Sequence, residues 1–197
     1  MTKGKAEAGN GAGARWLLAV RPKTLGLSAV PVLAGSWIAA QSGAFRTDVL
    51  AAALLSAGAI QIATNLWNDA ADGSRGTDGP DRLGPPRVTA LGLLEARQVR
   101  AGALLACGLA VLAGLYLALI GGWPIVVLGI VSLATGFLYS MGPYPLSSSP
   151  LGEGLVILFF GIAAVCGTGY LHGMVPDGRA ALLGLVIGLP AAAVLLV

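Results

Sequence analysis

Charged residues are scarce in this chain of 197 residues, at 11% of the sequence. Hydrophobic residues make up 56%, and the mean hydropathy is +0.81. Soluble domains carry about 25% charged residues, so this composition excludes that class and indicates a membrane protein. Strict alternation of apolar and polar residues is also missing, which argues against a membrane β-barrel. The expected fold class is therefore an all-α membrane protein, a multi-helix transmembrane bundle.

Cysteine and histidine are nearly absent, with two cysteines and one histidine. Cys107 and Cys166 fall in apolar segments without the spacing of a disulfide or metal pair, so we expect small packing residues. His172 follows the predicted fifth helix at its outer end, where a loop or interface role is expected. A nucleotide-binding GxxxxGK[ST] motif is missing, so a nucleotide-driven pump is not indicated.

Six apolar runs are long enough to cross a bilayer, which takes roughly 20 residues in a helix. They cover about 25–41, 49–67, 99–120, 123–140, 155–171 and 180–197. The 30 glycines suit close packing of helices in lipid. Residues 1–20 are expected to form a polar tail and an interfacial segment, with Trp16 at headgroup depth.

Lysine and arginine are unevenly distributed between the predicted connections. A cytoplasmic N-terminus places ten of the 12 basic residues inside and leaves only Arg46 and Arg179 outside. This distribution follows the positive-inside rule. The net charge of +3 then reflects topology and contact with anionic lipid, and no nucleic-acid partner is expected.

The stretch NLWNDAADGSRGTDGPDR, residues 65–82, concentrates acids and amides at the end of the second apolar run. Asn65, Asn68 (or Asp69) and Asp72 are three or four residues apart, so they line one helical stripe, with Gln61 and Thr64 one turn earlier. A polar stripe in a membrane helix usually faces a functional site. A merely solvated helix end would account for Asp78 and Asp81, which lie in the predicted loop. It accounts less well for the polar residues of the stripe, which begins within the bilayer: Asn65, Asn68, Asp69 and Asp72.

Carboxylates at this helix end repel one another and the negative end of the helix dipole, and a divalent cation would remove that conflict. Oxygen ligands without His or Cys favour Mg²⁺, which commonly completes its shell with phosphates. The following loop supplies Arg75, Arg82 and Arg87, whose guanidinium groups suit phosphate oxygens. The residues thus predict binding, and ionisation, of a phosphorylated lipid.

The stretch NDAADGSRGTD resembles the first aspartate-rich motif of the UbiA superfamily of intramembrane prenyltransferases. Three longer stretches resemble the 1,4-dihydroxy-2-naphthoate prenyltransferases of menaquinone biosynthesis in order and spacing. They are RPKTLGLSAVPVLAGS, QIATNLWNDAADGSRGTDGPDRLGPPRVTALGLL and YSMGPYPLSSSPLGEGLVILFFGIAAVCGTGYL. The resemblance implies that residues 21–197 form a partial domain of this type, with about six of the family's nine helices.

The resemblance also implies roles for particular residues. The first Mg²⁺ would be held by Asn68, Asp69 and Asp72, with Asp78 nearby and Asn65 in support. The substrate diphosphate would contact Arg87, Lys23 and Arg82, and the aromatic acceptor would be placed by Glu153 and Tyr139. The residues expected to be catalytic are Asp69, Asp72 and Glu153.

The reaction implied is transfer of a polyprenyl group from its diphosphate to 1,4-dihydroxy-2-naphthoate, giving demethylmenaquinone. The other expected partner is the lipid bilayer, with a homo-oligomer left open, and the expected location is the bacterial inner membrane with a cytoplasmic N-terminus. The family carries a second aspartate-rich motif, and this chain ends about where that motif would begin. We therefore expect the chain to be inactive alone, or to need a missing segment.

Three alternatives stay open. The acceptor could be another aromatic ring, such as 4-hydroxybenzoate. The stripe of amides and acids could be the ion site of a membrane cation transporter. The arginine-bearing loop argues against this alternative, because a transporter site should lie near the bilayer midplane. The chain could also be a non-catalytic helical remnant that packs with partners.

Overall fold

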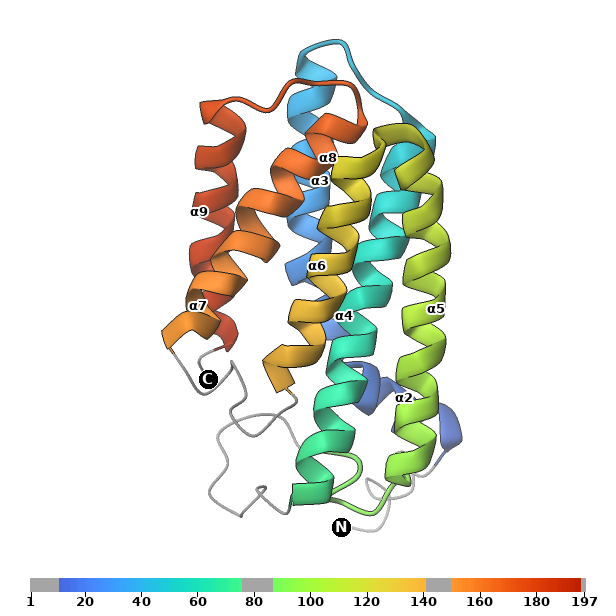
Figure 1. The fold of residues 1–197 in the computed structure, drawn as a ribbon. Helices are drawn as coiled ribbons and strands as arrows, with labels where there is room; N and C mark the ends of the chain where they lie inside the picture. The colour runs from blue at the N-terminus through green and yellow to red at the C-terminus, as the bar shows by residue number, and fades with distance from the viewer. Residues whose placement is uncertain (1–10, 76–86, 141–149, 196–197) are drawn as a thin grey trace, which may run out of the picture.

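The computed structural model describes residues 11–75, 87–140 and 150–195. These residues form a bundle of helices that run alongside one another, with connections at two ends (Figure 1). No β-strand occurs among them, which confirms the expected all-α class. The elements in chain order are α2 (Ala12–Val20), η1 (Pro22–Thr24), α3 (Leu25–Gln41), α4 (Thr47–Arg75), α5 (Ala96–Gly121), α6 (Trp123–Ser140), α7 (Pro150–Ile157), η3 (Leu158–Ala163), α8 (Ala164–Leu171) and α9 (Gly178–Leu195).

Over the described residues all six predicted spans are helical, with α7, η3 and α8 forming the fifth. The stretches long and apolar enough to cross a membrane are Ala12–Gln41, Thr47–Ala71, Ala96–Gly121 and Leu151–Leu171, joined by shorter apolar helices over Trp123–Tyr139 and Gly178–Val194. Large side chains such as Leu105 and Leu119 stay 78% and 87% exposed. Such a surface requires lipid around it, so the chain is a multi-pass membrane protein.

The boundaries of α4 differ from the sequence expectation. The apolar run ends near residue 67, but the helix continues to Arg75. A helix satisfies its own backbone hydrogen bonds and can therefore extend beyond the lipid. The aspartate-rich stretch consequently begins on a helix, and Arg75, which the sequence analysis placed in the following loop, is the last residue of α4.

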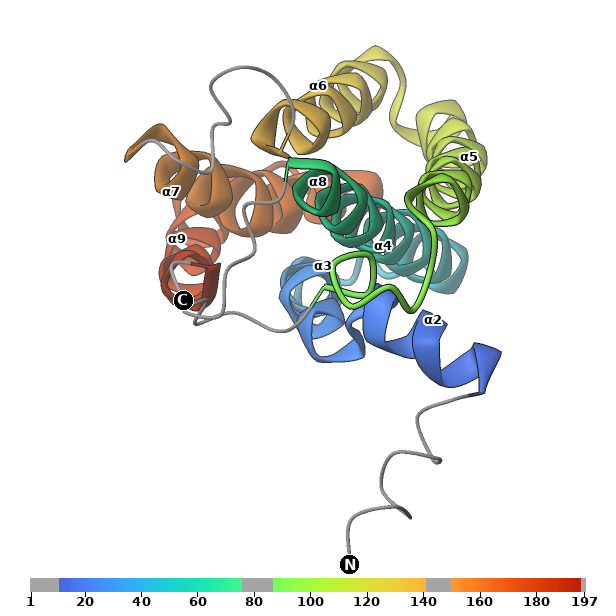
Figure 2. The same ribbon diagram turned by 90° about the horizontal axis from the view of Figure 1, so that it is seen from below.

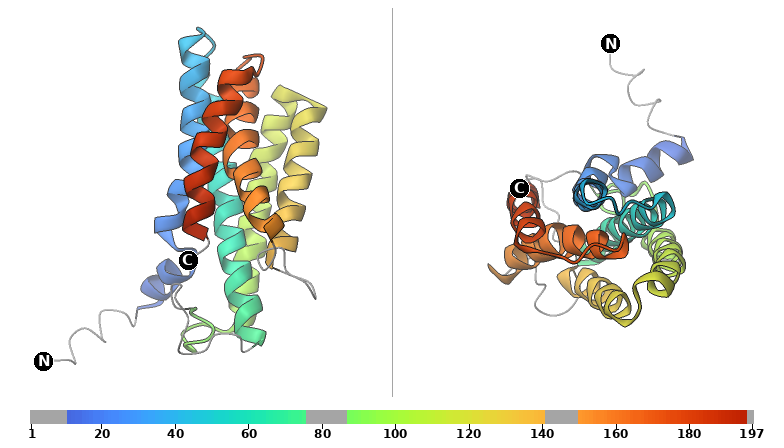
Figure 3. Two further views of the ribbon diagram at one scale, coloured as in Figure 1. Left: turned by 90° about the vertical axis from the view of Figure 1, so that its left-hand side faces the viewer. Right: turned by 90° about the horizontal axis from the view of Figure 1, so that it is seen from above.

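The two ends of the bundle differ in charge, as the sequence predicted. Arg46 and Arg179 lie at the upper end in Figure 1, at the starts of α4 and α9. The basic residues of α2, η1 and the first turn of α5 lie at the lower end. At that end α2 runs sideways from the bundle rather than along it (Figures 2 and 3).

The sideways helix α2 packs against the lower parts of α4 and α5. Ala19 is fully buried in a cluster with Leu66, Val88 and Val99. Trp16 is half-buried and lies so close to Gly102 that a Cβ there would meet its ring at 2.7 Å. Trp16, predicted at headgroup depth, therefore also helps to join α2 to α5.

The fifth span changes helical geometry in its middle. Leu158–Ala163 forms a π-helical turn, η3, between α7 and α8. Here its backbone meets α9 closely: a Cβ built on Gly184 would lie 2.6 Å from Ile162 Cα, and one on Gly188 would lie 2.7 Å from Ile157 O. Only glycine allows this approach, as is common between helices in lipid.

His172, at the upper end, has a structural environment. Arg46 N–H donates to Nδ1 at 3.1 Å, so Nε2 carries the proton and donates to Ser36 Oγ at 2.8 Å. Phe45 stacks on the ring with centroids 5.3 Å apart. The residue is 4% exposed and joins the α3–α4 connection to the end of α8, in agreement with the predicted loop or interface role.

Replacing Gly184 with alanine should separate η3 from α9. The new methyl would contact backbone atoms that cannot rotate away, so we expect a loss of about 1–3 kcal/mol of stability. Gly178→Ala in the same helix is the matched control, because nothing lies within 4 Å of its Cβ position. Thermal unfolding in detergent measures both variants, and equal stability would contradict the packing described.

Acidification should destabilise the upper end through His172. Burial lowers the pKa of this imidazole, against a smaller opposing effect of Asp48. The unfolded chain therefore takes up the proton first, so the stability from neutral His172 is complete above about pH 6.5 and is lost as pH falls below it. Thermal unfolding between about pH 8 and 5 should show this slope in the native protein. His172→Gln should reduce this dependence of stability on pH. If the slope is unchanged in the variant, it does not come from His172.

Candidate functional site

The second span is tied to the first by the buried side chain of Asn65. Its Nδ2 donates to Val20 O at 2.8 Å and to Thr24 Oγ1 at 2.8 Å. These acceptors flank Arg21, the one non-glycine residue with positive φ in the described part of the chain, at 56°. Asn65, predicted to support the metal site, thus holds the junction between α2 and α3.

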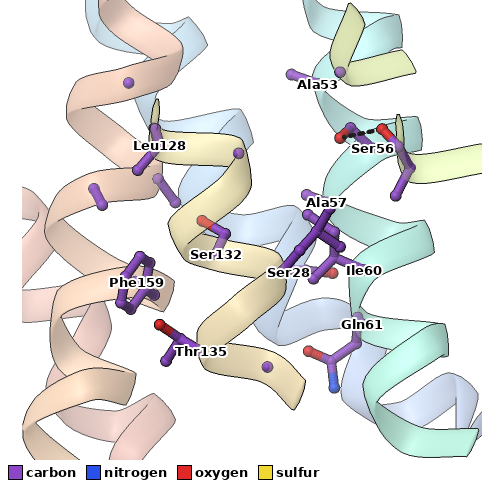
Figure 4. A pocket seen from close by; sticks show the side chains of 18 of the residues that line it. Ser28, Ala53, Ser56, Ala57, Ile60, Gln61, Leu128, Ser132, Thr135 and Phe159 are labelled. Atoms are coloured by element: carbon purple, nitrogen blue, oxygen red, sulfur yellow. Dashed lines mark hydrogen bonds between the residues drawn. The ribbon is translucent and has the colours of Figure 1, made fainter. Parts of the chain in front are cut away.

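A cavity of about 340 Å³ lies between the helices, and the amide-bearing face of α4 forms part of its wall. Its lining is mostly apolar and comes from α3, α4, α5, α6, α8 and the α7–η3 segment. Figure 4 shows Ser28, Gln61, Ser132, Thr135 and Phe159 around it, with Ser56 bonded to the main chain of Ala110. Apolar clefts with a few polar groups are typical of small-molecule sites.

Asn68 contributes a polar atom to the same cavity. It lines the wall one turn beyond Asn65, and its Oδ1 is buried without a hydrogen-bond partner among the described residues. A buried amide oxygen in that condition is unfavourable unless a ligand, an ion or a bound water supplies the missing interaction. This orphaned oxygen is the clearest sign of a binding site at this end of the cavity.

Asp69, the next residue, faces a different environment. It is 0% exposed, and it is not among the residues that line the cavity. Val88 N–H donates to Oδ2 at 2.9 Å, while Thr89 donates to Oδ1 from its N–H at 3.0 Å and its hydroxyl at 2.7 Å. The Thr89 hydroxyl also lies 2.7 Å from Asp69 O. Asp69 therefore holds the segment that begins at residue 87 against α4.

The predicted polar stripe is thus divided between two directions. Successive helix residues point about 100° apart, so Asn68 faces the cavity while Asp69 faces the loop segment. Asp72 follows Asn68 by four residues, and its position falls on the stripe of Asn65 and Asn68 by helical register. The side chain of Asp72 lies outside the described residues, as do Asp78 and Arg82.

The remaining predicted residues are distributed around this end. Arg87 is 7% exposed and directly precedes Val88, so it is carried by the segment that Asp69 holds. Tyr139 is half-buried and lines the cavity. Lys23 in η1 and Glu153 in the first turn of α7 are exposed. Within the described ranges, no three His, Cys, Asp or Glu side chains are grouped so that they could hold a metal ion.

Gln61 was noted in the stripe but was not among the predicted site residues. It is 4% exposed and lines the cavity. The available signal was its register, four residues before Asn65 and seven before Asn68, in the middle of an apolar span.

The fold and the site define a class: a multi-pass helical membrane protein with an internal, largely apolar binding cavity. A model of the UbiA prenyltransferase family matches residues 28–197. The chain belongs to this family, as the sequence motifs predicted. No solved structure matches the chain.

The matched relatives carry one name, 1,4-dihydroxy-2-naphthoate octaprenyltransferase. The chain is 38% identical to that of Mycobacterium tuberculosis over 164 residues, which is 83% of this chain and 56% of the relative. It is 34% identical to that of Escherichia coli over 82% of this chain and 55% of the relative. It is 36% identical to that of Bacillus subtilis over 75% of this chain and 46% of the relative. The chain spans about half the length of these relatives.

Asp69→Ala should release the segment that carries Arg87. The backbone N–H groups of Val88 and Thr89 lose their carboxylate acceptor in this variant. The free energy of local opening at these two amides should therefore fall by about 2 kcal/mol, so their hydrogen exchange should become about thirtyfold faster. Hydrogen exchange of the protein in detergent measures this. Asp177→Ala is the control, because Asp177 accepts from Arg179 and Ala180 at the start of α9. In Asp177→Ala, faster exchange should be confined to α9. If the amide of Val88 stays fully protected in Asp69→Ala, Asp69 does not hold this segment.

Proposed function

We propose that the protein transfers a polyprenyl group from its diphosphate to 1,4-dihydroxy-2-naphthoate, with loss of the carboxylate, to give demethylmenaquinone. The single observation that carries the proposal is the unpartnered Asn68 oxygen at the wall of an apolar cavity, on the helix that bears the NDAAD motif. The name shared by five relatives at 31–38% identity supports the choice of reaction and acceptor.

The donor set suits a magnesium ion. Asn68 offers an amide oxygen, and Asp72 and Asp78 would add carboxylates, which are the ligand types that Mg²⁺ prefers. A bound Mg²⁺ would supply charge neutralisation for the departing diphosphate. Asp69, predicted as a ligand and a catalytic residue, is assigned a positioning role in this proposal, because both of its oxygens already accept hydrogen bonds.

The remaining residues bind and orient the two substrates. Arg87, carried by the segment bonded to Asp69, would contact the diphosphate, with Lys23 and Arg82 as further cations. The apolar wall would exclude water from the reacting allylic carbon, whose developing charge water would otherwise quench. Tyr139 lines the same cavity and, with Glu153, would help to place the aromatic ring. The prenyl tail would extend toward the bilayer.

The proposed orientation places the lower end of the bundle in Figure 1 in the cytoplasm of a bacterial cell, with the N-terminus inside. The concentration of basic residues at this end supports that orientation. The soluble acceptor and the diphosphate headgroup would then reach Asn68 from the cytoplasm. The enzyme would act in the cell membrane.

Removing a proposed metal ligand should abolish the reaction. Asp72→Ala and Asn68→Ala should each lower prenyl transfer at least about a hundredfold, because the diphosphate loses its electrostatic stabilisation. The assay uses membranes containing the polypeptide from the complete gene, with labelled prenyl diphosphate, dihydroxynaphthoate and Mg²⁺. Asp177→Asn, which preserves the N-cap of α9, should retain activity.

Further arms of the same assay separate the alternatives. Chelation should stop transfer and added Mg²⁺ should restore it. Preferential transfer to 4-hydroxybenzoate would replace the proposed acceptor by another ring. Near-normal activity of Asp72→Ala would remove this motif from the mechanism, and cation flux in liposomes without any transfer would favour the transporter.

A further inference from the structure

Gln61 places a second unsatisfied acceptor in the cavity. The residue is 4% exposed, and its Oε1 is buried without a hydrogen-bond partner in the described part of the chain. In Figure 4 its side chain extends from α4 toward α6, with the oxygen turned toward the cavity. A buried carbonyl in this position is unfavourable unless a water molecule or a ligand donates to it.

The hydrogen-bond network determines which end of the Gln61 amide faces the cavity. Asn65 Nδ2 donates to Val20 O, a main-chain acceptor, so Asn65 must present its oxygen to Gln61. Gln61 Nε2 then donates to Asn65 Oδ1 at 3.1 Å. The Thr24 hydroxyl donates to Arg21 O at 2.9 Å, so its oxygen can only accept from the two amides. Two main-chain carbonyls therefore set the polarity of the network and leave Gln61 Oε1 as its free end.

A hydrocarbon chain cannot satisfy this oxygen, because it has no donor. A ligand that displaces water from Gln61 Oε1 without losing this hydrogen bond must carry an O–H or N–H group there, within an otherwise apolar frame. Of the two proposed substrates, the prenyl diphosphate has no such group in its tail. The dihydroxynaphthoate has two ring hydroxyls, of which the 1-hydroxyl lies beside the carboxylate and can bond to it internally. The 4-hydroxyl is the donor left for the protein.

We propose that Gln61 accepts a hydrogen bond from the 4-hydroxyl of the aromatic acceptor and thereby selects for a second ring hydroxyl. This inference rests on the proposed function and adds a specificity-determining residue to it. Gln61 lies seven residues from Asn68, which is about 10 Å along a helix, on the same stripe. The acceptor would therefore lie deeper in the cavity than the diphosphate, with its ring between the two amides.

Equilibrium dialysis of the protein in lipid nanodiscs, under a reducing atmosphere, tests the assignment without requiring catalysis. The two ligands compared are 1,4-dihydroxy-2-naphthoate and 1-hydroxy-2-naphthoate, which lacks only the 4-hydroxyl. The native protein should bind the dihydroxy compound about tenfold more tightly, because the analogue leaves Gln61 unpaired. Gln61→Leu should bring the ratio of the two dissociation constants close to one.

Gln41→Leu is the matched control, since it makes the same change at an exposed position at the end of α3, and it should keep the native ratio. Gln61→Met is the second variant should the leucine variant fail to insert, and the same loss of preference is expected. A native protein without preference, or a Gln61 variant that keeps it, would overturn the assignment. Prenyl transfer by the polypeptide from the complete gene, measured in parallel, separates the two proposals. If that polypeptide prefers the dihydroxy compound but transfers no prenyl group, the proposed reaction is refuted. If it transfers the prenyl group but shows no preference, only the role of Gln61 is refuted.

Discussion

The hydrogen bonds of Asn65 to Val20 and Thr24 are the constraint on which the lower end of the molecule depends. They fasten α4 to a junction whose Arg21 has a left-handed backbone, a conformation that costs roughly 1–2 kcal/mol in an L-residue. Each bond contributes about 1 kcal/mol net, and burial shields both from water, so together they offset that strain. The junction lets α2 leave the bundle sideways and bury Ala19 beneath α4 and α5. It also orients Gln61, because the same amide receives the Gln61 donor.

The stripe on α4 shows how one helix can serve two surfaces. Gln61, Asn65 and Asn68 share the cavity side, whereas Asp69 lies one residue further and faces the 87–89 segment. A motif written as consecutive letters is therefore not one site in space. Gln61 and Asn68, whose amide oxygens have no partner among the described residues, are suited to binding ligands. Asp69, whose two carboxylate oxygens already accept hydrogen bonds, is suited to holding the chain.

The sequence was a good guide to elements and a partial guide to the site. The runs 25–41 and 123–140 coincide with α3 and α6, because apolar composition marks where helices cross lipid. The sequence could not show that α4 continues to Arg75, because hydropathy indicates where a chain lies in lipid and not where a helix ends. The π-helical turn η3 was not predicted for another reason. It accompanies contacts with Gly184 and Gly188, which are distant from it in sequence. The sequence also could not predict the partners of Asp69, because Val88 and Thr89 are 19 and 20 residues away along the chain.

The electrostatics of the aspartate-rich helix end follow from those partners. Asp69 lies six residues before the end of α4, outside the last turn where the helix dipole acts, so the cost of its charge comes from burial, which is several kcal/mol for an anion. For Asp69 the compensation is internal: two N–H groups and a hydroxyl surround its carboxylate, and hydrogen bonds to charged groups contribute about 1.5–3 kcal/mol each. One charge of the motif is thus stabilised without a metal. In the proposed mechanism, the acids that follow Asp69 in the motif would therefore hold the cation. Asn68, whose Oδ1 has no partner among the described residues, is the neighbour that would share it.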